Sequence, residues 1–224
     1  KNSVALGTNA GNNNQLENAV AIGKLAGANS QSQNSVAIGN EAGNANQSLS
    51  SIAIGNKAGR NNQLGNSVAI GNLAGFDSQG ADSVAIGNSA GPHTQAQYTV
   101  AIGRNAGEIS QSGSAISIGE RSGQNNQGLT AVAIGSYSGN QNQGQGSVAI
   151  GGNAGEATQG IASIAIGELA GQNTQSTKSV AIGFLAGQTT QGDSSVAIGS
   201  NSGEISQGAN SIAIGNQAGQ TAQG

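Results

Sequence analysis

The chain consists of fourteen consecutive repeats of sixteen residues, which account for all 224 residues without an insertion or deletion. Two glycine columns, starting at Gly7 and Gly11, and one glutamine column, starting at Gln15, return at every sixteenth position. A short fixed period means that each repeat is one supersecondary unit that stacks on the next. We therefore predict a single uninterrupted repeat array over residues 1–224 that grows along one axis.

Each repeat contains a short segment with a period of two. In residues 67–71 the order is Ser-Val-Ala-Ile-Gly, and the equivalent segment of every repeat has Val or Ile at the second position. Branched residues that alternate with small ones are typical of a β-strand, whereas two glycines in each repeat disfavour a helix. Turn-forming residues follow the strand and close the repeat. The sequence predicts an all-β fold, a parallel β-solenoid (β-roll) of fourteen coils with two short strands each.

Composition excludes several classes of protein. Charged residues make up 8% of the chain and aromatic residues 2%, and the seven Lys and Arg residues are scattered. Nucleic-acid binding needs clustered cations, so we expect none. No stretch approaches the roughly twenty apolar residues of a membrane span, so we expect no membrane insertion by this segment. The chain has no cysteine, which excludes disulfides and thiol chemistry.

The strand pattern predicts two faces with different roles. We expect Val and Ile to face the interior of the coil, which would then hold few large apolar residues for a chain of this length. The opposite face is a plane of Ser, Ala and Gly that carries no charge in any repeat. We interpret this plane as a self-assembly face that packs against other copies, the alternative being that small residues only flatten the sheet. Its proposed alanines are Ala5, Ala21, Ala37, Ala53, Ala69, Ala85, Ala101, Ala133, Ala149, Ala165, Ala181, Ala197 and Ala213.

Glutamine is the one invariant polar residue of the repeat. Stacked amides can hydrogen-bond along the axis of a β-assembly, so a structural ladder is favoured over a ligand site. The Asn, Ser, Thr or, once, Ala before each glutamine points the other way on a regular strand, and the pattern leaves open which of the two is buried. The ladder consists of Gln15, Gln31, Gln47, Gln63, Gln79, Gln95, Gln111, Gln127, Gln143, Gln159, Gln175, Gln191, Gln207 and Gln223.

The hexapeptide Asn-Ser-Val-Ala-Ile-Gly, at residues 34–39 and 66–71, resembles the YadA-like head repeats of trimeric autotransporter adhesins. The longer form Ala-Gly-x-x-x-Gln-Gly, at residues 74–80 and 186–192, is similar to repeats in fibre proteins of phages and large DNA viruses. The resemblance extends over the whole chain. It implies a left-handed β-roll that assembles as a homotrimer and attaches to a surface.

The residues that usually carry catalysis are few and dispersed. His93 is the only histidine and stands in a variable position, so neither a catalytic triad nor a zinc site can be built around it. Glu108, Glu156 and Glu204 share one column but lie three coils apart, about 14 Å, which is too far for a metal site. We predict no enzyme activity, no catalytic residue, no cofactor and no metal.

Two functions remain. The first is a structural fibre of a cell surface, extracellular matrix or virion, with or without an adhesive role, whose partner is the chain itself as a trimer or an end-to-end polymer. The second is a flat-faced solenoid that binds ice, a glycan or another surface. Ice-binding faces are expected to carry paired Thr ladders, whereas Thr here is scattered among Asn and Ser. Both functions place the protein outside the cell or on the surface of a cell or virion.

Overall fold

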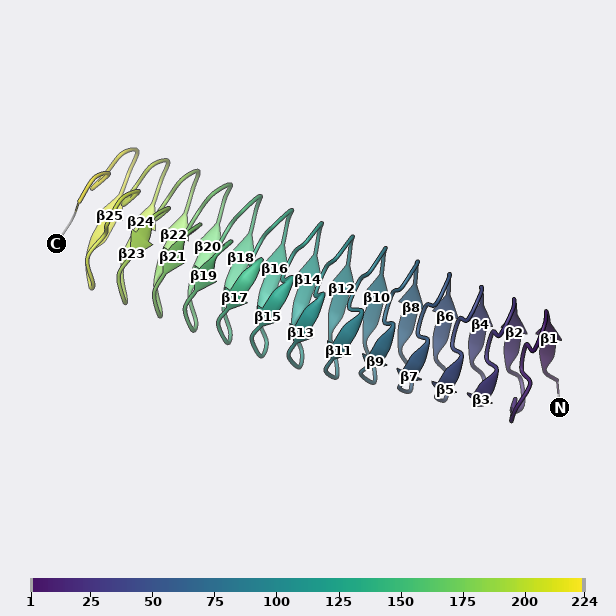
Figure 1. Cartoon of the computed structure of the whole chain (residues 1–224). Helices are drawn as coiled ribbons and strands as arrows, with labels where there is room; N and C mark the ends of the chain where they lie inside the picture. Colours follow the sequence, from purple (N-terminus) through teal and green to yellow (C-terminus); the bar gives the residue numbers. More distant parts are fainter. Residues whose placement is uncertain (1, 223–224) are drawn as a thin grey trace. The chain divides into compact units, whose positions relative to one another are not determined.

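The structure, a computed structural model, describes residues 2–222, and every regular element among them is a β-strand of two or three residues. The chain divides into two compact units, Lys1–Ser114 and Ala115–Gly224. Within each unit it winds into a parallel β-solenoid with coils of about sixteen residues and two parallel sheets (Figure 1). The predicted fold class is therefore confirmed. The left hand of the coil and the single uninterrupted array stay predictions.

Sheet A collects the Val-x-Ile segment of each coil. Its strands pair in parallel with equivalent residues in register, so that Val84 lies opposite both Val68 and Val100. Its strands in the N-terminal unit are β1 (Val4–Leu6), β2 (Val20–Ile22), β4 (Val36–Ile38), β6 (Ile52–Ile54), β8 (Val68–Ile70), β10 (Val84–Ile86) and β12 (Val100–Ile102). Those in the C-terminal unit are β14 (Ile116–Ile118), β16 (Val132–Ile134), β18 (Val148–Ile150), β20 (Ile164–Ile166), β22 (Val180–Ile182), β24 (Val196–Ile198) and β25 (Ile212–Ile214).

Sheet B collects the segment that ends at the conserved glutamine of each coil. Its strands in the N-terminal unit are β3 (Asn29–Gln31), β5 (Ala45–Gln47), β7 (Asn61–Gln63), β9 (Asp77–Gln79), β11 (His93–Gln95) and β13 (Ile109–Gln111). Those in the C-terminal unit are β15 (Asn125–Gln127), β17 (Gln141–Gln143), β19 (Thr158–Gln159), β21 (Thr174–Gln175) and β23 (Thr190–Gln191). Asn13 and Gln207 pair with Asn29 and Gln191 only through isolated bridges, so two coils have a shorter second segment than the sequence predicts.

The two glycine columns are required by geometry. Gly71 has φ +130°, and a Cβ there would lie 2.5 Å from the carbonyl oxygen of Gly87 in the next coil. Gly75 has φ +52°, and a Cβ there would lie 2.6 Å from Oε1 of Gln79. A side chain at either position would therefore be strained and would collide with its neighbours. These contacts explain why the glycines return in every repeat.

The interior of each coil is narrow and holds only small or polar side chains. Every apolar residue of the buried core in the described chain is alanine, and the largest fully buried side chains are glutamines. A Cβ placed on Gly75 would lie 3.3 Å from the Cβ of Ala69, so the walls of the coil are almost in contact. The prediction that Val and Ile fill the interior is therefore wrong, because the buried alanine and glutamine columns already occupy it.

Candidate functional surface

The structure contradicts the placement predicted for the alanine column. Ala5, in the first coil, is exposed, whereas the column from Ala21 to Ala213 is buried, with an exposed fraction of 0% at Ala133. These side chains lie inside their own coil, where a second copy of the chain cannot reach them. The predicted self-assembly face therefore has to be corrected. The buried members are Ala21, Ala37, Ala53, Ala69, Ala85, Ala101, Ala133, Ala149, Ala165, Ala181, Ala197 and Ala213.

The branched residues of sheet A point out of the coil, because neighbours on a strand face opposite sides and the alanine between them points in. Most of them are partly exposed; the exposed fraction is 36% at Ile134 and reaches 65% at Leu6 in the first coil. We call these two outward columns the apolar face. It consists of Val4, Leu6, Val20, Ile22, Val36, Ile38, Ile52, Ile54, Val68, Ile70, Val84, Ile86, Val100 and Ile102 in the N-terminal unit, and of Ile116, Ile118, Val132, Ile134, Val148, Ile150, Ile164, Ile166, Val180, Ile182, Val196, Ile198, Ile212 and Ile214 in the C-terminal unit.

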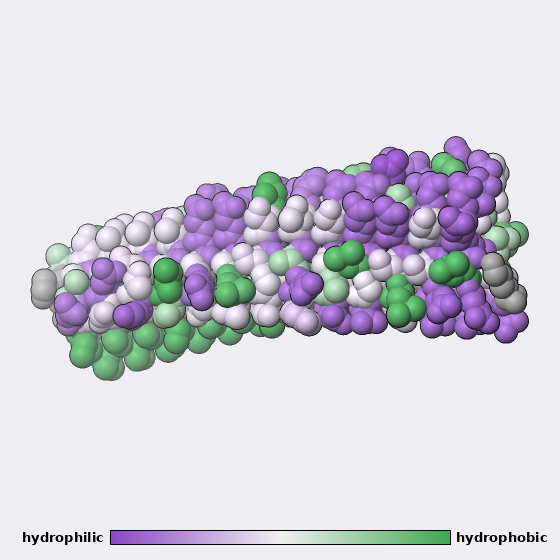
Figure 2. Space-filling view, turned by 90° about the horizontal axis from the view of Figure 1, so that it is seen from below, coloured by the Kyte–Doolittle hydropathy of each residue, from purple (hydrophilic) through white to green (hydrophobic). Residues whose placement is uncertain are grey.

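The apolar face contains no polar residue in either unit. Figure 2 shows apolar side chains gathered in a row along the lower edge of the molecule, on the side of the C-terminal unit. Isolated apolar residues are common on protein surfaces, but a contiguous patch larger than a few hundred Å² marks an interaction site. In-register stacking produces such a patch, because it repeats the same two branched side chains in every coil. The apolar face is the strongest candidate for a functional surface.

The glutamine column lies inside the coil. Gln63 is fully buried, and its Nε2 donates to the carbonyl oxygens of Ile52 at 2.7 Å and Ser67 at 3.3 Å, and to Oε1 of Gln79 at 3.3 Å. The preceding residue, Asn62, is exposed, which settles which of the two positions is buried. Each amide thus ties sheet B to sheet A within one coil and connects that coil to the next.

The same placement extends along the column, with small departures. The side chains from Gln31 to Gln207 are buried, Gln15 is partly exposed, and Gln223 lies outside the described residues. The Oε1 atoms of Gln47, Gln95, Gln159 and Gln207 have no hydrogen-bond partner among residues 2–222. At each of these steps the glutamine Nε2 of the preceding coil donates only to backbone carbonyl oxygens, so the axial ladder of side-chain amides is interrupted.

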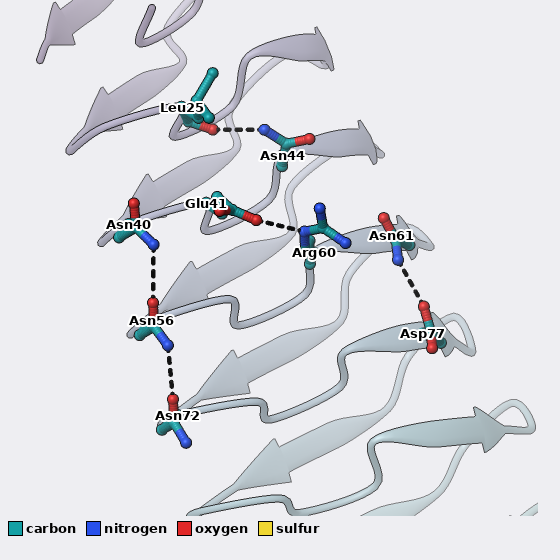
Figure 3. Close-up of polar contacts among 9 residues, drawn as sticks. All are labelled: Leu25, Asn40, Glu41, Asn44, Asn56, Arg60, Asn61, Asn72 and Asp77. Atoms are coloured by element: carbon teal, nitrogen blue, oxygen red, sulfur yellow. Dashed lines mark hydrogen bonds and ion pairs between the residues drawn. The ribbon is translucent and has the colours of Figure 1, made fainter. Parts of the chain in front are cut away.

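Exposed amides form shorter ladders on the outside of the coils. Nδ2 of Asn40 donates to Oδ1 of Asn56 at 3.0 Å, and Nδ2 of Asn56 donates to Oδ1 of Asn72 at 2.8 Å (Figure 3). Nearby, Nε of Arg60 donates to Oε2 of Glu41 at 2.7 Å. These groups pair with equivalent or adjacent positions of neighbouring coils, so they stabilise the stack.

The remaining candidates for chemistry stay dispersed. His93 is exposed, and its Nδ1 lies 3.7 Å from Oδ2 of Asp77, an exposed contact on sheet B. Within residues 2–222 no three His, Cys, Asp or Glu side chains are grouped so that they could hold a metal ion. No helix in that range is long and apolar enough to cross a membrane.

Comparison with known protein families matches three segments of the chain to one family. The sequence model of the YadA head domain repeat matches, in two copies, residues 17–42, 189–202 and 206–218. These three segments are similar to the YadA head domain repeat. Repeats of that family are surface-exposed, structural adhesin modules, and the similarity suggests an adhesin-type surface fibre. No curated protein and no solved structure matches the chain significantly.

Sequence reasoning found the correct strand but assigned its two faces the wrong way round. A signal was present in the buried glutamine column. A coil that encloses one large amide in every turn, beside two glycine columns, has little interior left for Val and Ile. The composition of the turns also pointed to a thin coil, because small residues occur at the third and tenth positions, as at Ser67 and Ala74, and both are buried.

Proposed function

We propose that the chain is the self-associating structural segment of an extracellular fibre, and that the apolar face is the contact between three copies. The observation that carries this proposal is the inverted distribution of side chains: alanine and glutamine lie inside the coil, and Val and Ile lie outside. Packing the apolar faces of three copies around one axis gives these residues the core that a single coil cannot provide. Burial of that surface stabilises the assembly by about 25 cal/mol per Å².

The family match supports the trimer, because YadA head repeats belong to trimeric adhesins. A cyclic contact also suits a face that is repeated in register, since every coil offers the same two side chains to its partners. The fibre would stand on a cell surface, in an extracellular matrix or on a virion. The outer turns, which carry exposed amide ladders and few charges, would then be the surface that contacts a receptor.

The deciding experiment compares neighbouring residues of β16. Val132→Glu places a carboxylate on the apolar face, and burying it unpaired costs several kcal/mol, so we expect light scattering to give the mass of one chain. We expect its far-ultraviolet circular dichroism to stay that of a β protein. Ala133→Glu places the carboxylate inside the coil and is expected to destroy that spectrum. Thr130→Glu, at an exposed position beside the strand, is the matched control and is expected to leave the mass unchanged.

A wild-type mass of one chain, or an unchanged mass for Val132→Glu, would overturn the proposal. A wild-type mass of two chains would retain the apolar contact and reject the trimer. The competing ice-binding function has less support. Ice-binding faces are expected to carry paired Thr ladders, whereas sheet B has a single outward column in which consecutive coils carry threonine, at Thr158, Thr174 and Thr190. Thermal hysteresis in the wild-type protein would favour that function instead.

A further inference from the structure

The described surface has a groove on the outside of sheet B, in the N-terminal unit. Its volume is about 530 Å³, within the range of small-molecule sites. The groove lies across β7, β9 and β11 and the turns that follow them. Its lining consists of Asn62, Leu64, Ser78, Gly80, Thr94, Gln95, Ala96 and Gln97.

The groove has a local cause in the sequence. The position after the conserved glutamine is Leu64 in one coil, Gly80 in the next and Ala96 in the third. A Cβ on Gly80 would lie 2.8 Å from the carbonyl oxygen of Gln95, so this position accepts only glycine and the two coils approach closely. The exposed Leu64 side chain stands at one end of the hollow left by Gly80 and Ala96. The groove therefore has a small apolar base at Gly80 and Ala96 and one apolar side formed by Leu64.

Four polar side chains of the lining are available to a ligand. Nδ2 of Asn62, Oγ of Ser78, Oγ1 of Thr94 and the side-chain amide of Gln97 make no hydrogen bond with the described residues, although Oδ1 of Asn62 accepts one from Asn46. These four residues are exposed and none of them is charged. A groove that offers amides and hydroxyls around apolar carbon complements a neutral ligand with many hydroxyl groups and exposed C–H groups.

The coil that contributes half of the lining is also locally strained. Thr94 has φ +40°, a left-handed conformation that β-branched residues rarely adopt. Within the described part of the chain, Gln95 makes neither of the hydrogen bonds to backbone carbonyls that its equivalents make, such as the bond from Gln79 to the carbonyl oxygen of Val68, and its buried Oε1 has no partner. Thr99 stands in the buried column that elsewhere holds Ser or Ala. Strain of this kind concentrates at ligand sites, where the surrounding structure maintains it.

We infer that this groove binds a neutral saccharide, with Leu64 and Ala96 against the C–H face of a sugar ring and Asn62, Ser78, Thr94 and Gln97 hydrogen-bonding its hydroxyl groups. The charged residues nearest in sequence, Asp77 and His93, are outside the lining and pair with each other. An anionic saccharide therefore has no cation to meet in the groove. The site is independent of the apolar face, which lies on sheet A.

The test uses the full chain with ¹³C-labelled methyl groups and four probes: maltotriose, cellotriose, lactose and the anionic 3′-sialyllactose. We expect saturable shifts of the Leu64 and Ala96 methyl signals with at least one neutral probe. Ala96→Leu fills the hollow with a side chain that the same column accepts at Leu16 and Leu64. We expect it to weaken binding by about tenfold, equivalent to about 1.4 kcal/mol.

Ser176→Leu is the matched control in the same column of the C-terminal unit, and it is expected to bind like wild type. Gln97→Ala is expected to weaken binding, and Gln33→Ala, an exposed glutamine of the same column outside the groove, is expected to have no effect. The inference is overturned if no neutral probe shifts the two methyl signals, if only 3′-sialyllactose binds, or if Ala96→Leu binds like wild type. The mass from light scattering stays unchanged in Ala96→Leu, so failure here is distinct from failure of the trimer.

Discussion

The backbone conformation of single residues in this protein is set by the stacking of the coils rather than by the intrinsic preference of each residue. Leu73 adopts φ +57°, although leucine has no intrinsic reason to enter the left-handed region. Its N–H donates to the carbonyl oxygen of Asn56 in the preceding coil at 3.0 Å. The same turn repeats at Lys57 with φ +56°. Stacking hydrogen bonds thus impose the turn on whatever residue the sequence provides, which explains why this column varies freely.

Replacing a buried glutamine is expected to destabilise the coil far more than replacing an exposed one. Gln63→Leu removes the donor to the carbonyl oxygens of Ile52 and Ser67, although the Ser67 oxygen still accepts the backbone N–H of Ile52. We expect a loss of about 1–3 kcal/mol in the free energy of unfolding. Urea denaturation at a fixed protein concentration measures the loss. Gln33→Leu, at an exposed position, is the control, and equal midpoints for the two variants would contradict the proposed role of the ladder.

The two kinds of glycine in the chain are expected to respond differently to a methyl group. Gly71→Ala introduces a Cβ 2.5 Å from the carbonyl oxygen of Gly87 at φ +130°, so we expect a loss of more than about 2 kcal/mol. Gly152 has open space around the added Cβ, with Cγ of Glu168 nearest at 3.9 Å, and Gly152→Ala is expected to be neutral or slightly stabilising. Thermal unfolding of the two variants compares them, and a stable Gly71→Ala protein would show that the coils can separate at this column.

At the scale of the element, sheet B has two local conformations that follow the residue before the glutamine. Ser78 and Asn126 are left-handed and belong to three-residue strands, whereas β21 (Thr174–Gln175) has two residues and Thr174 is not left-handed. The N–H of Thr174 donates forward to the carbonyl oxygen of Thr189, whereas that of Ser30 donates back to Asn13. A branched Cβ disfavours the left-handed region, and Thr158, Thr174 and Thr190 avoid it, whereas Thr94 stays left-handed at φ +40° in the three-residue strand β11.

This explanation predicts that the strand conformation can be switched by substitution. We expect replacement of Thr158, Thr174 and Thr190 together by Asn to give left-handed residues and three-residue strands, because Asn tolerates this region. The same three positions changed to Val keep the branched Cβ without the hydroxyl group and are expected to keep the extended conformation. Backbone carbon chemical shifts distinguish the two conformations. Left-handed shifts in the Val variant would show that the hydroxyl group, and not branching, decides the conformation.

An outer ladder of the C-terminal unit is expected to respond to pH. Hydrogen bonds from Nε2 of Gln220 at 2.8 Å and Nδ2 of Asn201 at 2.9 Å lower the pKa of Glu204 below its ordinary value of 4.5. A lowered pKa in the folded state means that the stabilisation is present above the ordinary pKa and is lost as the pH falls through the folded pKa. Gln220→Ala is expected to raise the pKa of Glu204, measured by titration of its carboxyl carbon in NMR spectra. Gln188→Ala, whose Nε2 donates to Gln172, is the control and is expected to leave it unchanged.

At the scale of the whole molecule, folding and assembly are expected to be coupled. Each unit presents its branched side chains outward, so in the proposed assembly these side chains form an apolar core only when copies associate. Ligand or partner binding to the folded state raises the unfolding temperature with concentration. We expect the unfolding temperature of the wild-type protein to rise with protein concentration and that of Val132→Glu to be lower and independent of it. A concentration-independent wild-type value, measured by calorimetry from dilute to concentrated protein, would contradict the assembly.

The sequence by itself determined the period, the parallel register and the all-β class, because the invariant columns of Gly7, Gly11 and Gln15 leave only a stacked coil of sixteen residues. It did not determine which side of the strand faces inward, since a strand that alternates Val or Ile with Ala has the same period in either orientation. The tertiary structure decided this through the width of the coil. Gln79 is buried in the interior, and a Cβ on Gly75 would lie 3.3 Å from the Cβ of Ala69, so the position of Ala69 has room for a methyl group and not for the side chain of Val or Ile.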